Sequence, residues 1–176
     1  MQIRQLLAAM MIPVFMMTSN AAGQDVEARL AELGIELTAP TAPVANYVNA
    51  VRTGNLLFLS GKGPTHPDGS QIQGKLGSDL TVEEGYEAAR LTGINLLAVL
   101  KDELGDLNRV NRIVKVMGMV NSAPDFTQQP AVVNGCSDLM VEVFGEKGRH
   151  ARAAVGMGAL PGNIAVEVDL VVEVAD

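Results

Sequence analysis

The sequence predicts a single α+β domain, in which a mixed β-sheet carries two helices on one face. Residues 164–174 alternate between apolar and polar side chains, as a half-buried strand does. Residues 81–105 open with a capping box and continue with apolar residues at helical spacing. Strand-like and helical segments follow in the order strands, helix, strand, helix, strands, which is typical of this fold class. A length of 176 residues fits one domain, or two at most.

The composition excludes several classes of protein. Hydrophobic residues make up 48% of the chain and charged residues 19%, so the chain can bury a core and is not a disordered tail. Aromatic residues are only 3%, which argues against a stacking platform for single-stranded nucleic acid. The net charge of −7 disfavours general binding to phosphate backbones. One cysteine excludes an intrachain disulfide, and two scattered histidines make a metal site unexpected.

The first 23 residues have the pattern of a secretory signal peptide. Arg4 precedes an apolar run over 6–17, and a short stretch of small and polar residues follows. The run is shorter than the roughly 20 residues of a membrane span. Cleavage after Ala21, Ala22 or Gly23 fits equally well, and it would place the protein in the periplasm or outside the cell. The alternative is a buried or interfacial helix in a cytoplasmic protein.

The mature chain starts with an extension to the domain. Residues 24–43 are expected to form a short amphipathic helix and a proline-containing linker, ahead of a domain over residues 44–176. The domain opens with two predicted strands and a hairpin turn between them, followed by a long loop. These segments are Tyr47–Val51, the turn Arg52–Gly54, Asn55–Ser60 and the loop 61–80.

The clearest element is a helix that begins at Thr81. Thr81 and Glu84 form the capping box, and the helix should end at Gly105. Gly93 lies in its middle, where it predicts close packing against another element.

The remaining elements follow from the same patterns. They are a strand over 110–120, a loop over 121–130, a second helix over 131–144, a strand over 152–157, a turn at 161–163 and a strand over 164–174.

Both helices are expected on the same face of the sheet, which leaves the other face uncovered within one chain. An exposed sheet face with few aromatic residues favours an oligomer that buries this face.

Two residues stand out as candidates for chemistry. Arg152 opens a strand after a polar turn, where a guanidinium can bind a carboxylate through two parallel hydrogen bonds. A surface ion pair is the alternative interpretation. Glu167 lies on the polar face of the last strand, where a carboxylate can act as a general base, although a solvated side chain fits the pattern equally well.

Other polar residues have simpler alternatives. Tyr47 could donate a hydrogen bond in a cleft, or it could be an ordinary aromatic residue of a strand. Asn134 could contact a ligand, or it could cap the N-terminus of a helix. Cys136 is a thiol near a helix start or a small buried side chain, with the buried role the commoner one. His150 is functional or a solvated loop histidine. The segment GKGP at 61–64 predicts a turn rather than a phosphate-binding loop.

Two groups of residues carry a resemblance to a known family. The first group resembles the C-terminal signature of the RidA/YjgF family. It consists of Ala151, Arg152 and Val155, then Leu160-Pro161, and then Glu167 between two valines. Tyr47-Val48, followed by Ser60-Gly61, is similar to the N-terminal signature of that family. The resemblance covers roughly residues 44–175.

The resemblance implies a chorismate-mutase-like fold that assembles as a homotrimer, with the sheets in a central barrel and clefts between subunits. Members of the RidA type hydrolyse reactive enamines and imines to 2-oxo acids and ammonia without a cofactor. By position, Arg152 would bind the substrate carboxylate and Glu167 would hold the attacking water. The expected cleft lining is Tyr47, Ser60, Gly61, Asn134 and Ala154, the last through its backbone amide.

The chain departs from the family pattern at three points. Ala154 stands where many members have cysteine, Lys62 follows Ser-Gly where glutamine is usual, and the segment 121–136 is long. An imine deaminase is therefore the leading hypothesis. A non-catalytic trimer that binds small carboxylates is the main alternative. An endoribonuclease is disfavoured by the acidic charge, and a chaperone-like or structural trimer is neither supported nor excluded.

Overall fold

A computed structural model describes residues 25–175 of the chain. The predicted signal peptide over residues 1–23 lies outside the described residues. Within 25–175, no helix is both long enough and apolar enough to cross a bilayer.

Five strands form one mixed sheet, in the spatial order β1-β2-β5-β3-β4. β3 and β4 run parallel, and the other three neighbouring pairs are antiparallel. The strands are β1 (Ala50–Thr53), β2 (Leu56–Lys62), β3 (Val110–Asn121), β4 (Ala151–Met157) and β5 (Val166–Val174). The central strand β5 is buried at every second residue, which confirms the alternation predicted from the sequence.

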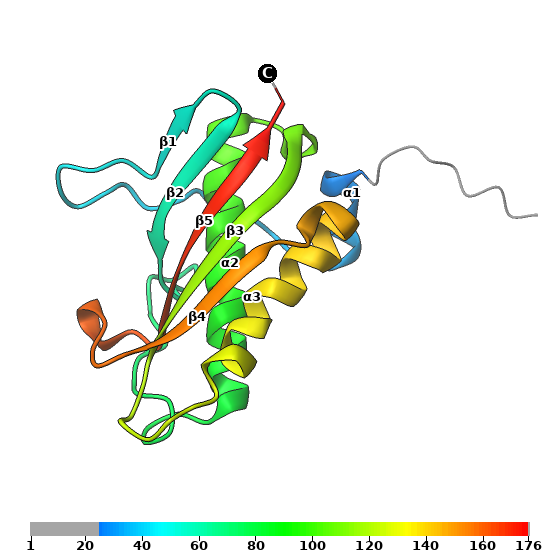
Figure 1. The fold of residues 1–176 in the computed structure, drawn as a ribbon. Coiled ribbons are helices and arrows are strands. Elements are labelled where there is room, and N and C mark those ends of the chain that lie inside the picture. Colours follow the sequence, from blue (N-terminus) through cyan, green and yellow to red (C-terminus); the bar gives the residue numbers. More distant parts are fainter. Residues whose placement is uncertain (1–24, 176) are drawn as a thin grey trace, which may run out of the picture.

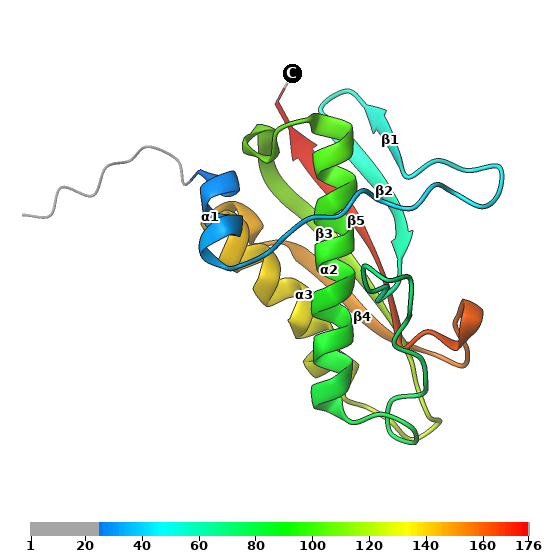
Figure 2. The same ribbon diagram turned by 180° about the vertical axis from the view of Figure 1, so that it is seen from behind.

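Two long helices cover one face of this sheet, as predicted. They are α2 (Val82–Leu104) and α3 (Gln129–Phe144), which lie side by side behind the sheet in Figure 1 and in front of it in Figure 2. The core fills the space between them and the sheet, with fully buried side chains such as Leu96, Leu139 and Leu170. The structure therefore confirms the predicted α+β domain, with a mixed sheet and two helices on one face.

The ends of α2 match the sequence signals. Thr81 accepts a hydrogen bond from the Glu84 amide, and the Glu84 carboxylate accepts one from the Thr81 amide. Gly105 ends the helix with φ of 72°, a left-handed conformation that glycine adopts without steric cost. A β-carbon on Gly93 would lie 2.8 Å from Cδ2 of Leu139, so the predicted close packing is confirmed.

The first hairpin differs from the prediction by a few residues. β1 begins at Ala50, so Tyr47 and Val48 precede the strand rather than belong to it. Arg52 and Thr53 are paired with β2, and the turn is the two residues Gly54-Asn55, with φ of 58° at Gly54. A two-residue turn with glycine in its first position matches the twist of a hairpin, which the predicted turn at Arg52–Gly54 overlooked.

The second helix also starts earlier than predicted. Pro130 lies in the first turn of α3 instead of the preceding loop, because a proline has no N–H to lose there. Gln128 is at the N-cap, so the N-cap role considered for Asn134 is wrong. Asn134 is an exposed residue within α3.

The short helix α1 (Val26–Glu32) packs against the domain instead of standing apart from it. Val26 and Leu30 are buried in the common core. Arg29 donates to the Glu142 carbonyl at the end of α3, and Glu27 pairs with Lys101 of α2 at 2.7 Å. The residues between α1 and β1 form no helix or strand, which agrees with the predicted linker.

The face of the sheet away from the helices is open in the single chain (Figure 1). Val51 and Phe58 point to this face and are 57% and 45% exposed. Their neighbours across β5, β3 and β4 are partly buried and mostly apolar: Val171, Met117, Met119 and Val155. The same face also carries Glu167, Asp169 and Lys115, so apolar side chains cover only part of it. An open sheet face with exposed apolar residues is typical of a surface that another protein surface covers.

Candidate functional site

The structure places the two predicted catalytic residues on opposite faces of the sheet. Arg152 of β4 is paired with the buried Val116, and its side chain reaches α3 on the helix side. Glu167 lies between the buried Val166 and Val168, so its side chain is on the open face. β3 also separates the strands that carry them, which adds roughly 10 Å. One chain therefore does not bring Arg152 and Glu167 together.

The guanidinium of Arg152 is held by two side chains of α3. One nitrogen, Nη1, donates to Asn134 Oδ1 at 2.8 Å and to Ser137 Oγ at 3.0 Å. Nη2 and Nε have no acceptor among residues 25–175, and the whole residue is exposed. The fork formed by Nη2 and Nε is therefore free to hold a carboxylate through two hydrogen bonds. Asn134, predicted to line the substrate cleft, lies beside this guanidinium.

Ser137 and His150 hold Arg152 in place through a chain of hydrogen bonds. Ser137 was not among the residues predicted from the sequence. His150 Nδ1 lies 2.6 Å from the Gly148 carbonyl, which only a protonated Nδ1 can satisfy. Nε2 is then free to accept from the Ser137 hydroxyl, 3.0 Å away, so the Ser137 oxygen accepts from Arg152. Burial lowers the pKa of His150, which favours this neutral form. His150 is thus half-buried and hydrogen-bonded, not a solvated loop residue.

Glu167 is half-buried on the open face, directly across from Met119. Its carboxylate lies against the α-carbon of Gly61, where any side chain would collide with it. Burial raises the pKa of Glu167, and the neighbouring Asp169 raises it further. A carboxylate with a raised pKa is a better proton acceptor, which suits a general base.

The other predicted lining residues lie at these two places and at a third, a cavity beside Lys62 that Tyr47 and Gly61 line. Ser60 and Gly61 lie beside Glu167 in a bulge of β2, and Ser60 donates to the Val48 carbonyl at 2.6 Å. Tyr47 is half exposed in the segment just before β1. Ala154 lies two residues beyond Arg152 on the edge strand β4.

Cys136 is a packing residue. It is completely buried in α3, and burial raises the pKa of its thiol to about 12. The thiol is therefore protonated at neutral pH and unreactive. Within residues 25–175, no three His, Cys, Asp or Glu side chains are arranged to hold a metal ion.

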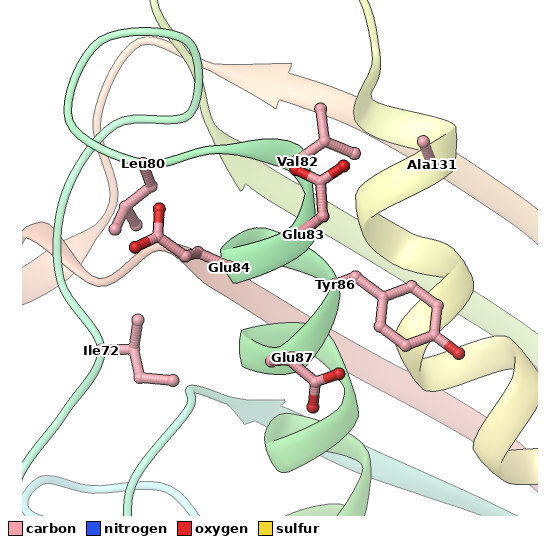
Figure 3. Close-up of a pocket in the computed structure, with 8 residues that line it drawn as sticks. All are labelled: Ile72, Leu80, Val82, Glu83, Glu84, Tyr86, Glu87 and Ala131. Carbon is pink, nitrogen blue, oxygen red and sulfur yellow. The ribbon is translucent and has the colours of Figure 1, made fainter.

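A pocket of about 560 Å³ does not suit a carboxylate substrate. It lies at the start of α2, beside Ala131 of α3 (Figure 3). Ile72, Leu80 and Val82 supply apolar walls, and none of the predicted site residues lines it. Its polar side chains include three glutamates, which repel an anion. These are Glu83, Glu84 and Glu87.

A family model with the description "YjgF/chorismate_mutase-like, putative endoribonuclease" matches residues 27–174. The chain belongs to the YjgF/RidA family. The match includes all of α1 except Val26, so it extends over nearly all of the described chain.

Individual relatives agree with this membership. "Protein TCP17" of Trypanosoma cruzi is 49% identical over 156 residues, which are 88% of this chain and 98% of that protein. The structure of a "putative endoribonuclease" from Shewanella oneidensis is 37% identical, with a TM-score of 0.83 over 86% of this chain and 100% of that one. RidA from an Antarctic Psychrobacter is 26% identical, with a TM-score of 0.55 over 77% and 94% of the two chains.

Proposed function

We propose that this protein hydrolyses imines and enamines of 2-oxo acids to the 2-oxo acid and ammonia, in clefts between the subunits of a homotrimer. The observation that carries the proposal is the separation of Arg152 and Glu167 onto opposite faces. A carboxylate-binding fork and a half-buried base become one site only when the open face of one copy meets the edge strand of another. The exposed apolar residues of the open face support such an assembly.

The reaction needs few groups because the carbon of an imine is already electrophilic. Arg152 holds the substrate carboxylate through Nη2 and Nε. Glu167 of the adjacent subunit takes a proton from a water molecule as that water attacks the C=N carbon. The addition breaks the C=N π bond, and transfer of that proton from Glu167 to the nitrogen gives a carbinolamine. Glu167 then takes the carbinol O–H proton as the C=O bond forms, and the nitrogen takes up this proton as the C–N bond breaks, so that imine and water become 2-oxo acid and ammonia. An enamine first takes a proton on carbon and loses one from nitrogen to become the imine.

Ammonia release tests the proposal. 2-Iminopropanoate is generated enzymatically, and its conversion is measured for the wild type, Arg152→Ala and Arg149→Ala. Arg149 is the matched control, because it lies three residues away and pairs only with the exposed Glu146. We expect turnover by the wild type and by Arg149→Ala, and its loss in Arg152→Ala.

The main alternative is a trimer that binds small carboxylates without turnover. A folded trimer that releases no ammonia, yet binds pyruvate through Arg152, would overturn the enzymatic proposal in favour of this one. If the wild type turns over substrate and Arg152→Ala does so equally well, Arg152 has no role in either the enzymatic or the binding proposal.

A further inference from the structure

A cavity of about 290 Å³ lies on the helix side of the sheet, away from the face that carries Glu167. Its walls come from the end of β2, the middle of α2 and the segment 38–41. Figure 2 shows the chain after α1 crossing in front of α2 toward this end of the molecule. The cavity is thus formed within one chain.

Among the described residues that line this cavity, Lys62 is the only lysine, arginine, aspartate or glutamate. Its register partner is the buried Val168, which puts Lys62 on the side of the sheet opposite Glu167. Nζ donates to Asn49 Oδ1 at 2.6 Å. An ammonium has three donors, and the other two have no acceptor among residues 25–175. No aspartate or glutamate lines the cavity.

A half-buried ammonium without a carboxylate partner is costly, because burial removes water that solvates the charge. The same burial lowers the pKa of Lys62. In the described part of the chain, the ion pairs within 4.0 Å do not include Lys62. An anion in the cavity would supply the missing counter-charge.

The surrounding side chains suit an oxyanion. Tyr47, Thr41 and Thr65 bring hydroxyl groups to the cavity wall, and His66 brings an imidazole. Asn95 fixes the opposite wall, because its amide donates to the Gly63 and Thr65 carbonyls at 3.0 Å each. The loop after β2 is therefore held in place and does not need to be ordered when a ligand binds.

We propose that the Lys62 cavity binds a small oxyanion of the dicarboxylate size class, one per chain. Its volume is about ten times the roughly 30 Å³ that a water molecule occupies in the liquid, which is enough for such an anion. The site does not include Arg152 and does not depend on the proposed deaminase activity, although Tyr47 and Gly61, which were predicted to line the substrate cleft, also line this cavity. Because Lys62 stands beside Gly61, an anion here would lie directly behind the backbone on which Glu167 rests.

Calorimetric titration with malonate tests the site. We expect one malonate site per chain that persists in Arg152→Ala, no binding of the uncharged analogue malonamide at this site, and at least a tenfold loss of affinity at this site in Lys62→Gln. Lys62→Arg should restore most of the affinity because it keeps the charge. Lys101→Gln is the matched control, since Lys101 is a partly buried lysine already paired with Glu27. Circular dichroism and thermal melting verify that each variant folds.

Three results would overturn the proposal: no malonate binding by the wild type, equal binding by Lys62→Gln, or equal binding of malonamide. Binding that is lost in Arg152→Ala and retained in Lys62→Gln would assign the anion to the proposed substrate cleft instead. Binding that survives in Arg152→Ala and is lost in Lys62→Gln supports the Lys62 site whether or not the protein is a deaminase.

Discussion

Arg152 is oriented by hydrogen bonds from Nη1 to Asn134 and Ser137, while Nη2 and Nε make none to the described residues. Ser137 and His150 act behind it, through a chain that starts at the Gly148 carbonyl and ends at Nη1. Such support restricts the rotamers of a long side chain before substrate arrives, which reduces the entropy lost on binding. This arrangement gives Ser137 and His150 a positioning role.

Ser137→Ala tests that role. One hydrogen bond contributes about 0.5–1.5 kcal/mol, so we expect KM for a carboxylate substrate to rise roughly 2- to 12-fold. The value of kcat should change much less, because Ser137 does not touch the reacting atoms. Asp138→Ala is a neighbouring control that leaves Arg152 untouched. An unchanged KM in Ser137→Ala, or a fall in kcat alone, would contradict the positioning role.

Glu167 ionises at a cost to stability, because its pKa is raised in the folded chain. Below about pH 4.5, the ordinary pKa, the carboxyl is protonated in both the folded and the unfolded states and the cost is absent. The cost appears as the pH rises through the raised pKa. Glu167→Gln should therefore melt roughly 1–3 °C above the wild type at pH 7, with no difference near pH 4. If calorimetry finds the same difference in melting temperature between Glu167→Gln and the wild type at pH 4 and at pH 7, the raised pKa of Glu167 is not the cause.

At the scale of the elements, the contact between α2 and α3 depends on glycines. A β-carbon on Gly135 would collide with the Tyr86 carbonyl and lie 3.0 Å from the Arg90 nitrogen, both backbone atoms that cannot rotate away. A β-carbon on Gly93 would meet mainly the flexible end of Leu139. The two helices therefore approach most closely at Gly135.

Substitution by alanine should separate these two glycines. Gly135→Ala is expected to lower the free energy of unfolding by about 2 kcal/mol or more through overpacking. Gly93→Ala should change it by less than about 1 kcal/mol, because alanine improves helix propensity while Leu139 moves aside. Denaturant unfolding measures both, and a larger loss in Gly93→Ala would contradict the packing described here.

The elements themselves were predictable wherever a periodic pattern was strong, as in β5 and α2. The hairpin was displaced because Gly54-Asn55, rather than Arg52–Gly54, has the residues that a two-residue turn needs. The support of Arg152 was not predictable, since it depends on the parallel pairing of β3 with β4 beside α3. One signal was present: Asn134 and Ser137 are three residues apart, which places them on the same face of a helix.

At the scale of the whole molecule, one chain carries the two halves of the proposed site apart from each other. Arg152 with its supports lies on the edge strand, and Glu167 lies on the open face. The proposed trimer would join the fork of one copy to the base of the next at each of its interfaces. A subunit alone would bind a carboxylate weakly and catalyse nothing.

Subunit mixing tests this claim most directly. Arg152→Ala and Glu167→Gln are each expected to be inactive, with losses of about 10²-fold or more. When the two variants are unfolded together and reassembled in equal amounts, a cleft is intact only if its arginine comes from a Glu167→Gln subunit and its glutamate comes from an Arg152→Ala subunit. Random assembly gives about a quarter of all clefts both groups, so ammonia release should recover to about a quarter of the wild-type rate. Mixed trimers that remain as inactive as their parents, beside a wild type that turns over, would contradict a site shared between two copies.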